Sequence, residues 1–137
     1  MNKTNLSHLQ INIDPKNKSF YKDLLIFLGW SVIIEESEFI GIGCESGASL
    51  WFCPPLKQVD NDYDGIGMNH LSFGTKSQKD VDETVAYLKE HNIQPLFETP
   101  RHRPEFCQDA EHTCYQVMFE SPDHILLEVV YMGLLEK

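Results

Sequence analysis

Two stretches decide the fold: His8-Leu9-Gln10-Ile11-Asn12-Ile13 and, 62 positions later, His70-Leu71-Ser72-Phe73-Gly74-Thr75. Each begins with histidine and then alternates apolar with polar or small residues. Side chains of a β-strand point to opposite faces in alternation, so each stretch is expected to have one polar face and one apolar face. The histidine falls on the polar face in both copies, and the repetition indicates an internal duplication.

The same order of elements is predicted after each copy. An amphipathic pattern predicts a helix over 19–28 in the first half, and a second helix is expected to begin near Ser77. In the first helix, the apolar stripe that faces inward is predicted at Phe20, Leu24, Phe27 and Leu28. Three short strands are expected after each helix, at 30–35, 39–44 and 48–52, and at 93–98, 115–120 and 125–131. The fold class is therefore α+β, with tandem βαβββ modules.

The chain has the size of one domain, with modules over about 1–60 and 66–137. Its 137 residues include 21 acidic and 11 basic residues, for a formal charge of −10, which argues against a nucleic-acid partner or an anionic membrane surface. No apolar stretch is long enough to cross a bilayer, and the first residues lack the apolar segment of a signal peptide, so a cytoplasmic location is expected. The spacing of the four cysteines predicts free thiols.

Glu128 is the most unusual residue of the predicted final strand, because it interrupts the apolar run over 125–131. A carboxylate in a mostly buried strand is costly unless it is paired or bound to a cation. Together with His8 and His70 it forms the ligand set of a 2-His-1-carboxylate metal site, which accepts a divalent first-row metal such as Fe, Mn, Zn, Ni or Co. Hydrogen-bonded histidines without a metal are the simpler alternative. Aligning the final strands of the two modules places Trp51 where Glu128 stands.

The segment 99–113 is predicted as a long polar connection of the kind that often carries function. Arg101 and Arg103, the only arginines of the chain, flank His102 there. An arginine fork suits a carboxylate or phosphate, and a histidine can act as acid or base near neutral pH. The segment is interpreted either as an anion clamp or as an exposed loop whose arginines pair with nearby acidic residues.

These features resemble the vicinal oxygen chelate superfamily, which includes glyoxalase I, fosfomycin-resistance proteins, extradiol dioxygenases, methylmalonyl-CoA epimerase and bleomycin-resistance proteins. The resemblance rests on paired βαβββ modules, on the histidine that opens each module, and on residues 119–128, Phe-Glu-Ser-Pro-Asp-His-Ile-Leu-Leu-Glu, which are similar to the family ending F-x-D-P-D-G-x-x-L-E. It implies a cupped, barrel-like mixed sheet with helices outside, a metal held by His8, His70 and Glu128, and a homodimer.

Two positions depart from the family pattern. Trp51 stands where glyoxalase I and the epimerase have a fourth metal ligand, and tryptophan cannot ligate a metal. This favours a three-ligand transferase or dioxygenase over a glyoxalase-type lyase. His124 replaces the glycine of a tight turn, where it is expected to be exposed and to tolerate a positive φ.

Two functions follow from the resemblance. The first is a metalloenzyme of the lyase, transferase or dioxygenase type, acting on a small molecule that chelates through adjacent oxygens. In it Glu128, His102 and Tyr115 are the candidate catalytic residues. Trp51, Arg101 and Arg103 are the candidate substrate-binding residues. The alternative is a metal-free protein of the bleomycin-resistance type that sequesters a small planar ligand on its aromatic residues.

Overall fold

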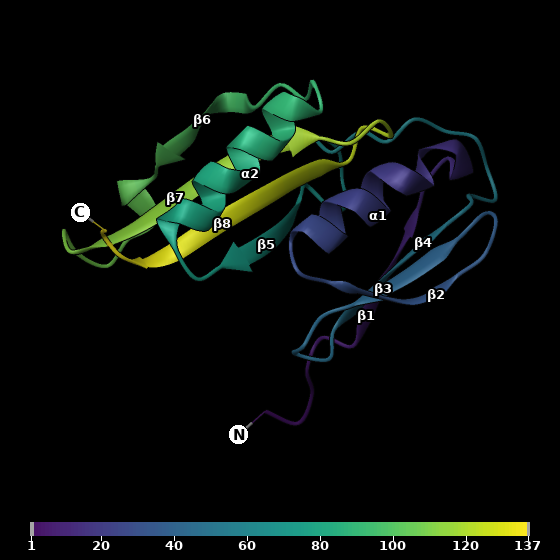
Figure 1. The fold of residues 1–137 in the computed structure, drawn as a ribbon, viewed down its shortest axis with the longest axis horizontal. Helices are drawn as coiled ribbons and strands as arrows, with labels where there is room; N and C mark the ends of the chain where they lie inside the picture. The colour runs from purple at the N-terminus through teal and green to yellow at the C-terminus, as the bar shows by residue number, and fades with distance from the viewer. Residues whose placement is uncertain (1, 137) are drawn as a thin grey trace. The chain divides into compact units, whose positions relative to one another are not determined.

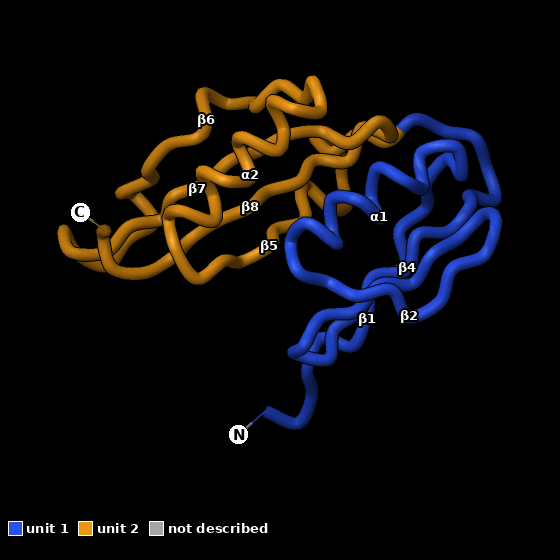
Figure 2. The backbone as a smooth tube through the Cα atoms, in the orientation of Figure 1, with its two compact units in different colours: residues 1–60 blue, residues 61–137 orange. Residues whose placement is uncertain are grey.

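The computed structural model describes residues 2–136, which form two units with the same succession of strands and α-helix (Figure 1). Unit 1 spans residues 1–60 and unit 2 spans residues 61–137 (Figure 2). Each unit contains one α-helix and one four-stranded mixed sheet, so the predicted α+β fold of tandem βαβββ modules is confirmed. None of the helices formed by residues 2–136 has the length and apolar character needed to span a bilayer.

Unit 1 has the strand order β1-β4-β3-β2. Its elements are β1 (His8–Asn12), the 3-10 helix η1 (Pro15–Asn17), α1 (Lys18–Phe27), β2 (Ser31–Glu35), β3 (Ile40–Gly43) and β4 (Ser49–Cys53). β1 runs parallel to β4, whereas β4, β3 and β2 are antiparallel neighbours. The side chains of β1 alternate as predicted, because His8, Gln10 and Asn12 are exposed while Ile11 is buried.

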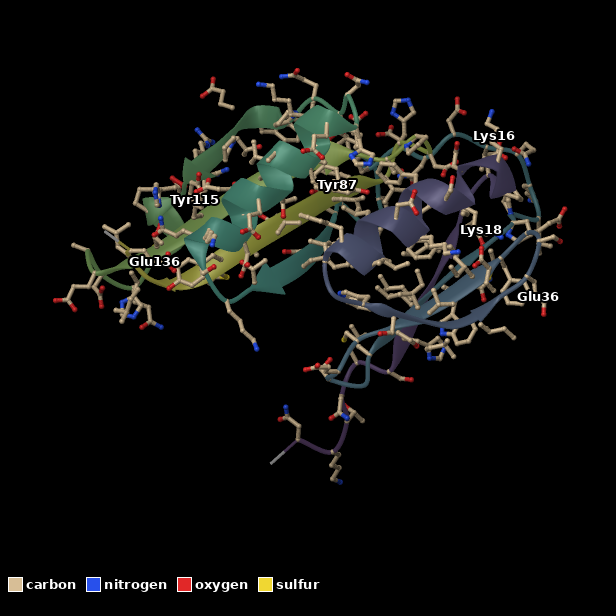
Figure 3. All side chains as sticks on the ribbon, in the orientation of Figure 1. Lys16, Lys18, Glu36, Tyr87, Tyr115 and Glu136 are labelled. Carbon is tan, nitrogen blue, oxygen red and sulfur yellow. The ribbon has the colours of Figure 1, made fainter. Side chains whose placement is uncertain are left out.

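Helix α1 covers its sheet with a stripe that differs from the predicted one. Tyr21, Leu24 and Leu25 are its buried residues, whereas Phe27 is 40% exposed. The ring of Tyr21 stacks on that of Phe52, with 4.5 Å between centroids, and this contact rotates the buried face by about one residue from the expected stripe. At the start of α1, Nζ of Lys18 lies 3.0 Å from a carboxylate oxygen of Glu35 and donates to the backbone oxygen of Glu36 at 2.6 Å. Lys18 and Glu36 are labelled in Figure 3.

Unit 2 repeats the topology with the order β5-β8-β7-β6. Its elements are β5 (Leu71–Thr75), α2 (Gln78–Glu90), β6 (Leu96–His102), the 3-10 helix η2 (Pro104–Phe106), β7 (His112–Glu120) and β8 (Leu126–Leu134). Ser77 caps α2 as predicted, since its hydroxyl accepts a hydrogen bond from the backbone N–H of Asp80 at 3.2 Å. Val81, Thr84 and Leu88 are the buried residues of the helix.

The connection predicted over 99–113 is shorter in the structure, where it spans residues 103–111 and contains η2. β6 extends to His102, and Arg101 and His102 pair with Gln116 and Tyr115 of β7. β6 is an edge strand, where a proline such as Pro100 is tolerated because the edge has no further ladder to complete. Its pairing is irregular between Leu96 and Arg101, so the strand has no clean alternation that the sequence could reveal.

The duplication extends to the pairing register. Gln10 lies opposite Trp51 in the parallel pair of unit 1, and Ser72 lies opposite Glu128 in the parallel pair of unit 2. Trp51 therefore occupies in unit 1 the position that Glu128 occupies in unit 2. The turn before β8 also follows the prediction, because His124 has a φ of 58° and a side chain that is 70% exposed.

Candidate functional site

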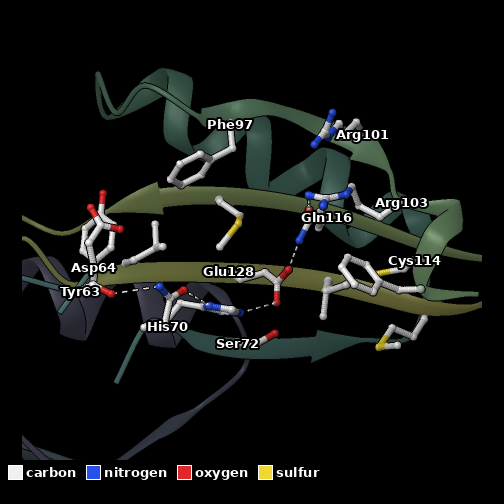
Figure 4. Close-up of a pocket in the computed structure, with 16 residues that line it drawn as sticks. Tyr63, Asp64, His70, Ser72, Phe97, Arg101, Arg103, Cys114, Gln116 and Glu128 are labelled. Carbon is white, nitrogen blue, oxygen red and sulfur yellow. Dashed lines mark hydrogen bonds and ion pairs between the residues drawn. The ribbon is translucent and has the colours of Figure 1, made fainter. Parts of the chain in front are cut away.

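A pocket of about 870 Å³ lies on the face of the unit 2 sheet opposite α2 (Figure 4). It is formed within unit 2 by residues of β5 to β8, of η2 and of the segment before β5. Its polar lining consists of Tyr63, Asp64, Asn69, His70, Ser72, Arg101, Arg103, Gln116 and Glu128. Its apolar lining includes Phe97, Phe106, Met118, Leu126, Val130 and Met132.

Glu128 is the buried acid of this pocket, with 7% of its surface exposed. It projects from the middle of β8, next to Met118 of β7 and Ser72 of β5. Nε2 of Gln116 donates a hydrogen bond to its Oε2, and Nε2 of His70 lies 3.6 Å from its Oε1. The carboxylate therefore has an amide donor on one oxygen and an imidazole on the other. Burial, helped by the charge of Glu128, raises the pKa of the neighbouring Cys114 thiol.

The proton of His70 can be assigned from its neighbours. Nδ2 of Asn69 donates to the backbone oxygen of Tyr63 at 3.0 Å, which turns Oδ1 of Asn69 toward Nδ1 of His70 at 2.7 Å. Oδ1 is only an acceptor, so Nδ1 carries a proton. In the neutral imidazole Nε2 then presents a lone pair to the Glu128 carboxylate. Nε2 of His70 and Oε1 of Glu128 would then repel each other unless a proton or a cation lies between them.

Arg103 is held by protein partners. Its Nη1 donates to Oε1 of Gln116 at 3.1 Å, and its Nε donates to Oε1 of Glu105 at 2.5 Å. The guanidinium also lies over the ring of Phe106, 5.1 Å from its centroid. Arg103 thus orients the Gln116 amide, whose other end contacts Glu128. These contacts form a continuous polar chain from Arg103 through Gln116 and Glu128 to His70 (Figure 4).

His102 and Tyr115 are not brought together with Glu128. Tyr115 precedes Gln116 on β7 and points to the α2 face, where its hydroxyl donates to Oδ1 of Asp82 at 2.6 Å. The ring of His102 packs against Tyr115, with 4.6 Å between centroids, and its Nδ1 lies 2.5 Å from the Thr113 hydroxyl. Burial and the Asp82 carboxylate raise the pKa of Tyr115 to about 12. Both residues have local partners on the face opposite the pocket.

His8 and Trp51 belong to unit 1. Nδ1 of His8 lies 2.9 Å from the hydroxyl of Ser7, so His8 and His70 are each contacted at Nδ1 by the residue before them. Nε1 of Trp51 donates to the Ser49 hydroxyl at 2.9 Å, and its ring covers Gly41. Among residues 2–136, no group of three or more His, Cys, Asp or Glu side chains is positioned to hold a metal ion.

The residues that hold this site together, Gln116, Asn69 and Tyr63, are not among the site residues predicted from the sequence. Asn69 immediately precedes His70, as Ser7 precedes His8, and this repeated polar neighbour was a usable signal. Gln116 gave no local signal, because its contact with Glu128 depends on the pairing of β7 with β8.

The chain is similar in structure to proteins of the glyoxalase type. A candidate glyoxalase from Bacillus halodurans has 27% sequence identity and a TM-score of 0.78, with 94% of this chain and 96% of that chain covered. A glyoxalase/dioxygenase from Nostoc punctiforme has 15% identity and a TM-score of 0.72, with 94% and 91% covered. A glyoxalase/bleomycin resistance protein from Albidiferax ferrireducens T118 has 18% identity and a TM-score of 0.70, with 92% and 98% covered.

The neighbours are glyoxalase/bleomycin resistance/dioxygenase proteins, which is consistent with the vicinal oxygen chelate superfamily, and the resemblance predicted from the sequence is confirmed. No model of a known protein family matches the sequence. No curated protein matches it either.

Proposed function

We propose that the chain is a small-molecule metalloenzyme that binds one divalent first-row metal through His70 and Glu128, with His8 as the third ligand predicted by the sequence duplication. One contact supports this most directly. Nε2 of His70 lies 3.6 Å from Oε1 of Glu128, and the Asn69 acceptor at Nδ1 makes Nε2 the lone-pair atom of the neutral imidazole. Imidazole and carboxylate are the donor types that Fe, Mn, Zn, Ni and Co accept, so the donor set fits such an ion.

A bound divalent metal supplies Lewis acidity toward the adjacent oxygens of a small ligand. The residues of the pocket have separate tasks. Gln116 occupies Oε2 of Glu128, so Oε1, which faces His70, is the carboxylate oxygen that would hold the metal. Asn69 holds the imidazole of His70 in one orientation. Whether the reaction is of the lyase, transferase or dioxygenase type depends on the substrate. A screen of small molecules against the metal-loaded protein would identify that substrate.

Metal content tests this proposal. Elemental mass spectrometry of tag-free protein, after reconstitution with Fe(II), Mn(II), Co(II), Ni(II) or Zn(II), is expected to give about one metal per chain. His8→Ala, His70→Ala and Glu128→Gln should each lose it, whereas His124→Ala, at an exposed turn histidine, should retain it. Metal-free protein under all five conditions, or full occupancy in the His70→Ala variant, refutes the metalloenzyme.

The second candidate function is a metal-free binding protein for a small planar ligand. Phe97 and Phe106 favour it, because both line the pocket while being 51% and 61% exposed, and a planar ligand would cover them. Trp51 adds a further aromatic side chain in unit 1. Ligand binding that persists in His70→Ala and Glu128→Gln protein favours the binding protein over the enzyme.

The superfamily resemblance also supports a homodimer. Light scattering on the purified chain measures this directly, and a mass equal to one chain refutes it.

A further inference from the structure

The two arginines of the pocket differ in how fully their guanidinium groups are engaged by protein partners. Arg103 is engaged by Gln116, Glu105 and the ring of Phe106. Among the described residues, Arg101 has one ion pair, to Glu98 at 3.6 Å, and the Glu98 side chain is 88% exposed. Nε of Arg101 is a buried nitrogen that lacks a hydrogen-bond partner within residues 2–136. A buried donor without a partner costs free energy, and the Arg101 side chain as a whole is 41% exposed, so an acceptor on a ligand can reach its guanidinium.

We propose that Arg101 is the anion-binding residue of the unit 2 pocket, and that its ligand is a small organic carboxylate with an apolar body. This deepens the proposed function, because it rests on the same pocket being the ligand site. It does not depend on the metal. Arginine presents two parallel donors that match the two oxygens of a carboxylate.

The surroundings of Arg101 define the rest of the ligand. Arg101 pairs with Gln116 on β7, and β8 with Glu128 is the next strand. Two strand spacings amount to about 10 Å. The pocket surface between Arg101 and Glu128 is apolar. Met118 and Val130 there are 8% and 7% exposed, and Met132, which lines the same pocket, is 65% exposed. A compact acid with its carboxylate at Arg101 would direct its other end toward Glu128 and cover these side chains.

Charge supports the choice of an anion. The chain carries a formal charge of −10 and only two arginines, both of which line this pocket. In an acidic protein a carboxylate ligand requires a local cation, and within residues 2–136 the only ion pair of the Arg101 guanidinium is with the exposed side chain of Glu98. Its β6 neighbour Glu98 competes weakly for it, because exposed ion pairs contribute little.

Benzoate and its neutral analogue benzamide test the proposal on metal-free protein. Methyl NMR of ¹³C-methionine protein reports on Met118 and Met132 inside the pocket. Benzoate is expected to shift both methyl signals saturably, and benzamide to bind about tenfold more weakly or worse. Arg101→Gln should weaken benzoate by a similar factor, Arg101→Lys by less, and Glu98→Gln should bind benzoate at least as tightly as the wild type.

Three results would overturn the proposal. They are equal binding of benzoate and benzamide, unchanged benzoate affinity in Arg101→Gln protein, and no shift with benzoate up to about 20 mM, since a fragment of this size binds in the millimolar range. The benzoate and benzamide comparison uses the wild-type chain, so it decides the matter even if Arg101→Gln misfolds. Because the metal is absent, the outcome is independent of the metal-content experiment.

Discussion

Gln116 donates its amide to one oxygen of the Glu128 carboxylate and leaves the other oxygen facing His70. The two residues lie on adjacent antiparallel strands and project from the same face of the sheet, one diagonal step apart. Arg103 fixes the amide by donating to its oxygen at 3.1 Å. A buried carboxylate in the middle of a strand is thereby made tolerable.

Replacing Gln116 with methionine keeps the volume and removes the amide. Oε2 of Glu128 and Nη1 of Arg103 then both lose a partner, and the free energy of unfolding should fall by about 1–3 kcal/mol. Urea denaturation measures the change. Met118→Leu, a volume-conserving change beside Glu128, is the control and should cost under about 1.5 kcal/mol. Equal stability of Gln116→Met and wild type would show that the amide is dispensable.

Removing the Asn69 side chain should weaken metal binding without removing a ligand. Asn69→Ala frees the His70 ring to rotate and to change tautomer, and losing such a supporting contact typically costs about 10–100-fold in metal affinity. Asn69→Asp, which keeps the acceptor, should retain most of the affinity. Competition titration with a chelating dye gives the dissociation constants. Wild-type affinity in Asn69→Ala protein would exclude Asn69 as a positioning residue.

Gly41 is predicted to be intolerant of a side chain. A Cβ at this position would lie 2.4 Å from Cζ3 of Trp51, whose ring lies across β3. Gly41→Ala should therefore destabilise the chain by about 1–3 kcal/mol. The loss should shrink in a Trp51→Leu background, as thermal unfolding of the double-mutant cycle would report. Gly74→Ala is the matched control, since a Cβ there meets no atom within 4 Å; a similar loss at both glycines would contradict the Trp51 contact.

Two tyrosines are expected to ionise late. The Glu120 carboxylate, 2.5 Å from the Tyr63 hydroxyl, raises the pKa of Tyr63 from 10.0 to about 12. Burial and Asp82 raise the pKa of Tyr115 from 10.0 to about 12. Absorbance titration of the folded protein should show both transitions near pH 12, and Tyr63→Phe and Tyr115→Phe should each remove one.

The same shifts predict how stability depends on pH. The folded chain binds these phenol protons more tightly than the unfolded chain, so the stabilisation is fully present below pH 10 and is lost as the pH rises through about 12. The decline in unfolding free energy over that range should be smaller in each phenylalanine variant. A decline as steep as that of the wild type in both variants would assign it to other groups.

The regular strands and helices were predictable because their periodicity is local. β1 and β5 were expected within one or two residues of their bounds, as were the Ser77 cap of α2 and the equivalence of Trp51 and Glu128. β6 was not, because Pro100 and four polar residues obscure the alternation of an edge strand with irregular pairing. The stripe of α1 was displaced because the contact of Tyr21 with Phe52 decides which side of the helix is buried.

The sequence by itself determined the duplicated modules, the polar face that begins with each histidine, and the presence of one acid in an apolar strand. Those features depend on residues a few positions apart, whose periodicity any strand or helix must express. Only the tertiary structure decided which side chains meet Glu128. Gln116 is 12 residues away and His70 is 58 residues away along the chain, and they reach the same carboxylate because β7 and β5 are the two neighbours of β8. The same pairing placed Tyr115 and His102 on the opposite face, since a strand turns each successive side chain to the other side of its sheet.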